Sequence, residues 1–329
     1  LIGDVFEQGV RNAEPELTRI PGGGRLAVDS AQGPWVVKPD GSRRRLGDYR
    51  EATWSPHGLF LAAASGRTLT AVEPDGDPRW SVSAPARVHD PRWSPNGLRI
   101  AYLAGSQLRV VDADGSDDRL IARHLWPMAP VWSPAGLPEL AYVDAERRLV
   151  VRDTGSGRAL LEAKALPAID TLTWGGSGTL LEASGGRIRV RPLDARKLVP
   201  GVRLGRPREF DLGGRLLDVD LSPGAGTIAV LRGLGPARRP RAEVDLIERR
   251  SGAMQRLFRT PGHLGEIAWS PDAQRLLISW PQADQWLFMP VSGRTRAPQA
   301  VAGIARTFAP GDRATGPFPR LAGWCCSAP

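Results

Sequence analysis

Short apolar runs separated by polar turns follow one another along almost the whole chain. The clearest example is residues 98–121, where apolar runs at 98–103, 108–111 and 118–121 are divided by short polar segments. The segment Asp112-Ala113-Asp114-Gly115 joins the second run to the third. An Asp-Gly pair between two apolar runs predicts a hairpin, because glycine readily takes the positive φ that such a turn needs. We therefore expect strands joined by tight turns.

The runs are organised by a repeated Trp-Ser-Pro step. Trp54-Ser55-Pro56-His57-Gly58 returns at 93–97, at 132–136 and, without the glycine, at 269–272, and degenerate copies are centred on Trp174 and Leu221. The anchors at 54, 93, 132, 174, 221 and 269 are separated by 39, 39, 42, 47 and 48 residues. A period of about 40–50 residues indicates a repeat protein. Each repeat holds four predicted strands, A to D, with the tryptophan at the end of strand A, which predicts an all-β fold, the β-propeller.

Counting the repeats predicts seven four-stranded antiparallel blades in a single domain, 16–326. The first is degenerate: residues 16–23 align with residues 51–58. The expected blades lie near 16–50, 51–89, 90–128, 129–170, 171–216, 217–265 and 266–303. Residues 1–15 are expected to be an N-terminal extension or cap, and 304–326 to close the ring against the first blade. Eight or six blades are the less favoured alternatives. Strand D of the fifth blade has no clear place within 192–214, and 232–242 is expected to be a loop inserted in the sixth.

The repeat resembles a known family of propellers. The pattern is an apolar residue, then Trp-Ser-Pro-x-Gly, then a segment such as Ile100-Ala101-Tyr102 and a strand that ends in Asp-x-x-Gly. This pattern resembles the TolB-type, WD-repeat-like propellers. It is also similar to the propeller domains of prolyl-oligopeptidase-type peptidases. The resemblance covers about residues 16–310. It implies the fold and says little about function. The Trp-Asp pairs of true WD repeats are missing, Gly-His occurs only at 262–263, and no α/β-hydrolase half follows.

Composition adds expectations about partners and location. The net charge is +9 and the isoelectric point about 10.5, but the arginines are spread through every repeat. Since no helix-turn-helix or RNA-binding signature accompanies them, we expect no specific nucleic-acid binding. The diffuse positive field favours a protein partner or an acidic envelope polymer. No apolar run reaches the length of a membrane span. We expect a monomer that is extracytoplasmic, in a bacterial envelope or secreted, with a membrane anchor upstream of Leu1 as a further option.

The two cysteines, Cys325 and Cys326, are adjacent. A pair of thiols in a C-terminal strand is the favoured interpretation, and a vicinal disulfide is the alternative. Two neighbouring ligands do not make a zinc site. We expect no cofactor in this protein, with a Ca²⁺ or other cation in the central channel as the alternative.

Candidate binding residues recur at one position of the repeat. Three residues before the anchor position, five of the seven repeats have a carboxylate: Glu16, Glu51, Asp90, Asp218 and Glu266. The other two repeats have Ala129 and Thr171 there. Because strand A is the innermost strand of a blade, the five carboxylates are expected around one mouth of the central channel, with His89 and His263 nearby. Pairing with arginine or backbone is the favoured interpretation, since buried charges are normally paired. A Ca²⁺ ion or a cationic ligand is the second, and catalysis by two carboxylates the third.

No catalytic motif of the hydrolase or metalloprotease kind is present in the sequence. We therefore expect a non-catalytic propeller that binds a protein or ligand at the channel mouth. The alternative is a hydrolase or lyase that acts on polysaccharide through the channel-mouth carboxylates. A third option is the sensor half of a membrane-anchored regulator.

Overall fold

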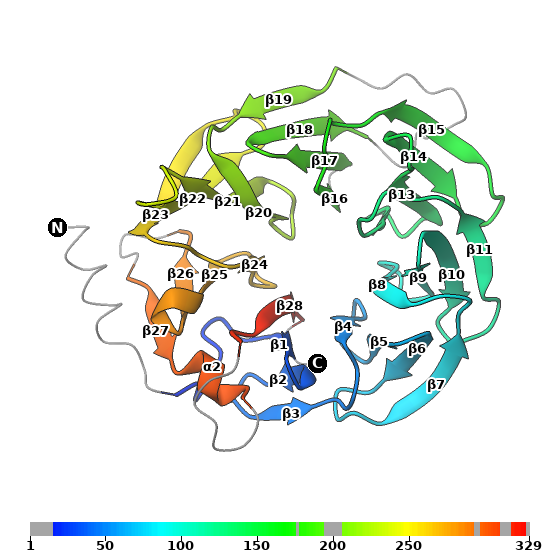
Figure 1. The fold of residues 1–329 in the computed structure, drawn as a ribbon, viewed down its shortest axis with the longest axis horizontal. Coiled ribbons are helices and arrows are strands. Elements are labelled where there is room, and N and C mark those ends of the chain that lie inside the picture. The colour runs from blue at the N-terminus through cyan, green and yellow to red at the C-terminus, as the bar shows by residue number, and fades with distance from the viewer. Residues whose placement is uncertain (1–15, 176–177, 194–205, 293–296, 310–316, 327–329) are drawn as a thin grey trace. The chain divides into compact units, whose positions relative to one another are not determined.

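The computed structural model describes residues 16–175, 178–193, 206–292, 297–309 and 317–326. These residues form seven four-stranded antiparallel sheets (Figure 1). In six of them the four strands are consecutive along the chain, and in the seventh the last strand of the chain pairs with the first. The number of sheets and their strand order confirm the seven predicted blades. The chain divides into two compact units. We call Tyr49–Leu216 the middle unit, and Leu1–Asp48 with Leu217–Pro329 the terminal unit, and describe each by itself.

The middle unit holds four sheets, and the first strands of neighbouring sheets lie side by side. The first sheet is β4 (Glu51–Trp54), β5 (Leu61–Ser65), β6 (Thr68–Val72) and β7 (Pro78–Ser83). The second is β8 (Val88–Trp93), β9 (Arg99–Ala104), β10 (Gln107–Asp112) and β11 (Arg119–Ala122). The third is β12 (Val131–Trp132), β13 (Glu139–Val143), β14 (Arg148–Asp153) and β15 (Ala159–Lys164). The fourth is β16 (Thr171–Gly175), β17 (Thr179–Ser184), β18 (Arg187–Pro192) and β19 (Arg208–Asp211).

The terminal unit holds three sheets. One is β20 (Arg215–Leu221), β21 (Thr227–Leu234), β22 (Arg241–Glu248) and β23 (Met254–Pro261). The next is β24 (Ile267–Trp269), β25 (Arg275–Trp280), β26 (Gln285–Pro290) and β27 (Gln299–Ala302), with the 3₁₀ turn η2 (Pro281–Ala283) and the short helix α2 (Ile304–Thr307). The last joins both ends of the chain: β28 (Arg320–Cys325) pairs with β1 (Arg25–Ser30), followed by β2 (Gly33–Val37) and β3 (Arg43–Arg45).

The pairing of β28 with β1 confirms the expected closure of the first blade by the C-terminal segment. Its register pairs Arg25 with Cys325 and Leu26 with Trp324. The aligned copy at 16–23 was wrongly predicted to supply the first strand of this blade, since residues 16–20 form no strand. Because β28 already occupies that edge of β1, the N-terminal copy is left as a connection. The predicted cap at 1–15 lies outside the described residues.

The cores lie between successive sheets, which explains the unbroken apolar runs. In β9, Ile100 and Tyr102 pack into the core shared with the preceding sheet, whereas Ala101 and Leu103 pack into the core shared with the following sheet. Neighbouring residues of a strand point to opposite faces, so a sheet covered on both sides needs apolar residues at consecutive positions. The strand therefore reads as a continuous apolar run.

In four sheets the serine of the Ser-Pro step closes the turn that leaves the first strand. Ser94 Oγ accepts a hydrogen bond from Arg99 N at 2.9 Å, and Ser270 Oγ accepts one from Arg275 N at 2.9 Å. Gly97 has a φ of 72°, in the left-handed region where a residue without a Cβ atom is favoured. The serine and glycine of the repeat are thus explained by local hydrogen bonding and backbone geometry.

Two anchor tryptophans also bond to the preceding sheet. Trp132 Nε1 donates to Arg92 O at 2.8 Å, and Trp269 Nε1 donates to Asp220 O at 3.2 Å. Both side chains are buried. The acceptor is in each case the residue before the previous anchor, so these tryptophans fasten consecutive blades, as expected of packing residues.

We predict that Trp132→Phe lowers the free energy of unfolding by about 1 kcal/mol more than Trp93→Phe does. Both changes remove the same atoms, but only the Trp132 indole N–H has a hydrogen-bond partner among the described residues, and a neutral hydrogen bond contributes about that much. Urea denaturation of the two variants measures the difference. Equal losses would show that the bond to Arg92 contributes nothing.

The structure defines strand D of the fifth blade and the segments 232–242 and 304–307. The missing strand D of the fifth blade is β19. The insertion expected at 232–242 is narrower, because β21 extends to Leu234 and β22 begins at Arg241, which leaves only 235–240 as the loop between them. Arg232, predicted to lie in a loop, is buried and pairs with Glu243 at 3.0 Å and with Asp245 at 2.7 Å. Residues 304–307, expected in the closing segment, are helical.

Cys325 and Cys326 form a vicinal disulfide, which corrects the favoured thiol interpretation. Among the described residues, no helix has both the length and the apolar character needed to cross a bilayer.

Candidate functional site

The predicted site residues fall into two groups, one in each unit. Glu51, His89 and Asp90 lie together in the middle unit, at the starts of β4 and β8. Asp218 and Glu266 lie together in the terminal unit, on β20 and just before β24. The remaining two are exposed: Glu16 in the first connection and His263 between β23 and β24.

The middle-unit group is built on a bulge at the start of β8. The register of β8 with β9 shifts between His89 and Arg92, and Asp90 has a φ of 53°. A bulge redirects side chains and interrupts the ladder. It frees the backbone amide of Asp90, which donates to Glu51 Oε1 at 3.2 Å. The bulge thereby ties the first strands of two neighbouring sheets together.

His89 has both ring nitrogens engaged. Nδ1 lies 3.0 Å from Asp90 Oδ2, and Nε2 lies 3.1 Å from Gly105 O. Both partners are acceptors when Asp90 is ionised, so the arrangement favours the doubly protonated imidazolium. The hydrogen bond with Asp90 raises the pKa of His89 above its usual value. In this state His89 has no lone pair for a metal or for a proton from a substrate.

The Glu51 carboxyl is partly buried in the same group. Burial raises its pKa above the usual value, and the neighbouring Asp90 charge raises it further. Arg92 lies 3.6 Å from Asp90 and offsets part of this charge. The group is a small network of opposite charges and backbone bonds, in agreement with the pairing interpretation.

The terminal-unit group contains a carboxylate that the sequence analysis missed. Asp218 Oδ2 accepts from Ile267 N at 2.8 Å, and Asp220 Oδ2 accepts from Trp269 N at 3.1 Å. Residues two apart on a strand face the same side, so both reach β24. Asp220 stands one residue before the degenerate anchor, and the i, i+2 spacing from Asp218 was the signal that could have found it.

Burial dominates the ionisation of this pair. The residues keep some accessible surface, but each carboxyl group is closely surrounded by protein. Desolvation raises the pKa of Asp218 to about 6 and that of Asp220 to about 7, against a usual 3.8. The bonds from the β24 amides lower both values, and this lowering is outweighed. The carboxylates act here as acceptors for a neighbouring strand.

Glu266 joins the same region to the C-terminal strand. Its Oε1 lies 3.3 Å from Arg320 Nε on β28, and Ser279 Oγ lies 3.4 Å from its Oε2. Four of the five predicted carboxylates are therefore bonded to arginine, histidine, serine or backbone within their own units. The binding role predicted for them stays a prediction.

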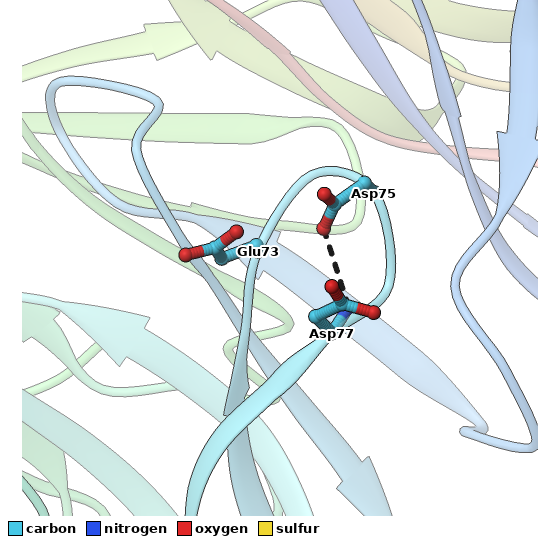
Figure 2. Close-up of side chains that lie close together, drawn as sticks. All are labelled: Glu73, Asp75 and Asp77. Carbon is cyan, nitrogen blue, oxygen red and sulfur yellow. Dashed lines mark hydrogen bonds between the residues drawn. The ribbon is translucent and has the colours of Figure 1, made fainter.

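An acidic cluster outside the predicted set lies in the turn between β6 and β7 (Figure 2). Carboxylate oxygens of Glu73, Asp75 and Asp77 lie within 4.8 Å of one another. Glu73 also pairs with Arg79, and the backbone amide of Asp77 donates to Asp75 Oδ1 at 3.3 Å. Asp75 and Asp77 are exposed. These contacts are those of a closed turn, and acidic side chains alone do not define a metal site.

Two pockets lie in the middle unit, at opposite ends of its strands. One, about 520 Å³, is formed by the β8–β9 and β10–β11 turns of the second sheet with Trp132, Leu137 and Pro138 of the third. The other, about 620 Å³, is formed by two segments. Residues 146–148 lie where the β13–β14 turn leads into β14, and residues 162–167 include the end of β15 and the connection that follows it. Both volumes fall within the range of small-ligand pockets.

Comparison with solved structures shows the fold. The β-propeller domain of Cps50 (Swd1) from Myceliophteria thermophila aligns with a TM-score of 0.61 and 21% identity, over 79% of this chain and 93% of that one. A chain of the mitotic checkpoint complex gives 0.60 and 17%, over 80% and 83%. Hydrazine synthase from Kuenenia stuttgartiensis gives 0.59 and 18%, over 74% and 76%.

These likenesses and the seven four-stranded sheets define the fold: a seven-bladed β-propeller. No protein-family model matches the sequence, and no curated protein matches it. The TolB-type resemblance stays a prediction, because identities near 20% carry the fold alone.

Proposed function

We propose that this propeller is a non-catalytic scaffold that binds a protein partner. The observation that carries the proposal is the engagement of the predicted carboxylates. Glu51, Asp90, Asp218 and Glu266 each take part in bonds that hold strands together. A general acid or nucleophile must instead present its carboxyl to a substrate. Their structural contacts therefore support binding in preference to the polysaccharide-cleaving alternative.

The named likenesses support the same class. Two of the similar structures are a propeller domain of Swd1 and a chain of an assembly, the mitotic checkpoint complex. A propeller presents loops on a rigid β-framework, which suits recognition of other proteins. We place the partner site at the end of the middle unit that carries Glu51, Asp90 and the 620 Å³ pocket. An extracytoplasmic setting in a bacterial envelope is part of the proposal and rests on composition alone.

The test is binding to a purified partner. The chain is used to enrich partners from the cells that make it, and each candidate is then purified and titrated by calorimetry. We expect a one-to-one complex that weakens about tenfold or more when Glu51 and Asp90 are both replaced by alanine, because their bonds hold the starts of β4 and β8 in place at this end. Asp211→Ala, an exposed change on β19, is the matched control.

Two outcomes would overturn the proposal. One is cleavage of a polysaccharide by the purified chain that is lost in Glu51→Gln, since the scaffold has no catalytic role. The other is full binding by the double alanine variant with its fold intact by circular dichroism, which would remove the partner from this end.

A further inference from the structure

Large apolar side chains are exposed at one repeated position. Within the described residues, the large hydrophobic side chains that are most exposed are Leu59 at 57%, Leu98 at 63% and Met254 at 53%. Leu59 and Leu98 each follow the glycine of a Trp-Ser-Pro-x-Gly turn, and Leu137, half-buried, holds the same position in the next repeat. In the later repeats the position is Thr179, Gly226 and Gln274. A leucine at this position is therefore a property of three consecutive sheets of the middle unit, and it is exposed in the first two.

The turns that carry these leucines lie at one end of their sheets. In an up-and-down sheet the turn after the first strand and the turn after the third lie at the same end. Hydrogen bonds join them: Ala113 N donates to Leu98 O at 2.9 Å, and Thr154 N donates to Pro138 O at 2.8 Å. Neighbouring sheets are joined as well, because Trp80 Nε1 on β7 donates to Ala113 O at 2.7 Å. The turns form one connected surface, which we call the leucine face.

The 520 Å³ pocket opens on the leucine face. Leu98, Leu137 and Pro138 supply apolar lining, with Trp132 also part of the wall. Asn96 Nδ2 donates to Gly136 O at 2.9 Å and holds the two turns around the pocket at a fixed separation. Gly115 is packed against the Trp80 ring, since a Cβ atom there would lie 2.8 Å from it. The pocket is thus preformed by packed and hydrogen-bonded turns.

The rim of the leucine face is acidic, in a chain whose net charge is +9. Segments 73–77 and 112–118 contain three and four carboxylates and neither lysine nor arginine. Arginines pair with some of these: Arg79 with Glu73, and Arg109 with Asp118 at 2.7 Å. Asp75, Asp77 and Asp114 are exposed, and none of them forms an ion pair within the described part of the chain. Their charges remain available to a cationic partner.

We propose that the leucine face is a docking surface for a basic segment of a partner protein that inserts an apolar side chain beside Leu98. The pocket takes the apolar side chain between Leu98 and Leu137. Leu59 offers a further exposed apolar contact on the neighbouring sheet, and lysine or arginine on either side meets Asp75, Asp77 and Asp114. Apolar contact with an opposite charge at the rim is the usual anatomy of a specific interface. This inference rests on the proposed scaffold function and adds a second surface, at the other end of the sheets from Glu51 and Asp90.

The test uses a defined probe. A fluorescein-labelled peptide in which leucine and lysine alternate over eight positions is titrated with the whole chain and followed by fluorescence polarisation. We expect saturable binding that weakens about tenfold in the double variant Leu59→Ser, Leu98→Ser, because a buried leucine contributes that much or more. Replacing Asp75, Asp77 and Asp114 by asparagine should weaken binding and reduce its dependence on salt. Met254→Ser, which changes an equally exposed residue on β23, should bind as the unaltered chain does.

The controls separate the alternatives. A peptide with glutamate in place of lysine is expected not to bind, and Glu51→Ala with Asp90→Ala is expected to keep full binding of the lysine peptide. Loss of lysine-peptide binding in that variant would indicate that the peptide binds at the end that carries Glu51 and Asp90. It would overturn the leucine-face proposal and leave the scaffold proposal standing. Equal binding of both peptides, or equal weakening by Met254→Ser, would show a non-specific contact. Self-association of the chain that disappears in the leucine variant would identify a second copy as the occupant and also overturn the proposal.

Discussion

Removal of residues 317–329 is expected to lower the melting temperature by about 10 °C or more. This change deletes β28 and with it the antiparallel pairing to β1 at five positions. It also removes Trp324, whose ring meets Phe288 edge to face at 5.7 Å and whose Nε1 donates to Gly23 O at 2.9 Å. The lost strand bonds and apolar contacts add up to roughly 5 kcal/mol, a large share of the stability of a typical domain.

Thermal melts followed by circular dichroism measure this effect. Removal of residues 327–329 alone is the matched control and should leave the melting temperature within about 1–2 °C of the full chain. If the longer truncation yields no folded protein, Trp324→Ala provides the graded version, with a loss of about 3 kcal/mol. A truncated chain that melts like the full one would mean that β28 does not hold the first blade together.

Asp220→Asn is expected to stabilise the protein at pH 8 by about 2 kcal/mol and to change little at pH 5. The folded-state pKa of Asp220 is raised to about 7 by burial, whereas in the unfolded chain it is near 3.9. Between these values the folded state holds a proton that the unfolded state has released. Stability therefore falls as the pH rises from about 4 to 7, and ionised Asp220 destabilises the fold above that range.

The size of the gain follows from two opposing effects. A shift of about three pKa units corresponds to roughly 4 kcal/mol. An asparagine keeps an oxygen for Trp269 N but brings a buried amide NH₂, which costs about 1–3 kcal/mol when it lacks a partner. Asp218, raised to about 6, titrates in the same range and interacts with Asp220, so the pair shares the dependence.

Urea denaturation at pH 5 and pH 8 checks this prediction. Asp211→Asn, an exposed change on β19, serves as the control and should alter stability by less than about 0.5 kcal/mol at both values. Equal effects of Asp220→Asn at the two pH values would contradict a buried ionisation at this position.

Much of the architecture was predictable because short-range sequence patterns determine the strand ends and the turns. The Trp-Ser-Pro step marks the end of a first strand through bonds that lie within a few residues, such as Arg99 N to Ser94 Oγ. The Asp-Gly turns follow from the positive φ of glycine, as at Gly115 with φ of 88°. Since most repeats carry at least part of these signals at a similar spacing, the period predicted seven sheets, with six or eight as the alternatives.

The pairing of the chain ends was less well defined by sequence. The copy at 16–23 resembles the other repeats, yet β28 takes the edge of β1. Both segments pack into the same terminal-unit core, through Leu17 and Ile20 of the N-terminal copy and through Leu321 and Trp324 of the C-terminal segment. Only the C-terminal segment pairs with β1. Local patterns cannot rank such alternatives.

The sequence by itself determined the repeat, the number of sheets and the position at which carboxylates recur. Only the tertiary structure decided what those carboxylates do, because their ionisation and partners depend on neighbouring sheets. Asp218 and Asp220 reach β24 across almost fifty residues, and Asp90 reaches Glu51 from the next repeat. The exposure of the Leu59 and Leu98 side chains was likewise not predictable from the repeated sequence. A periodic sequence specifies where a residue recurs, whereas burial and charge partners arise only when the repeats pack.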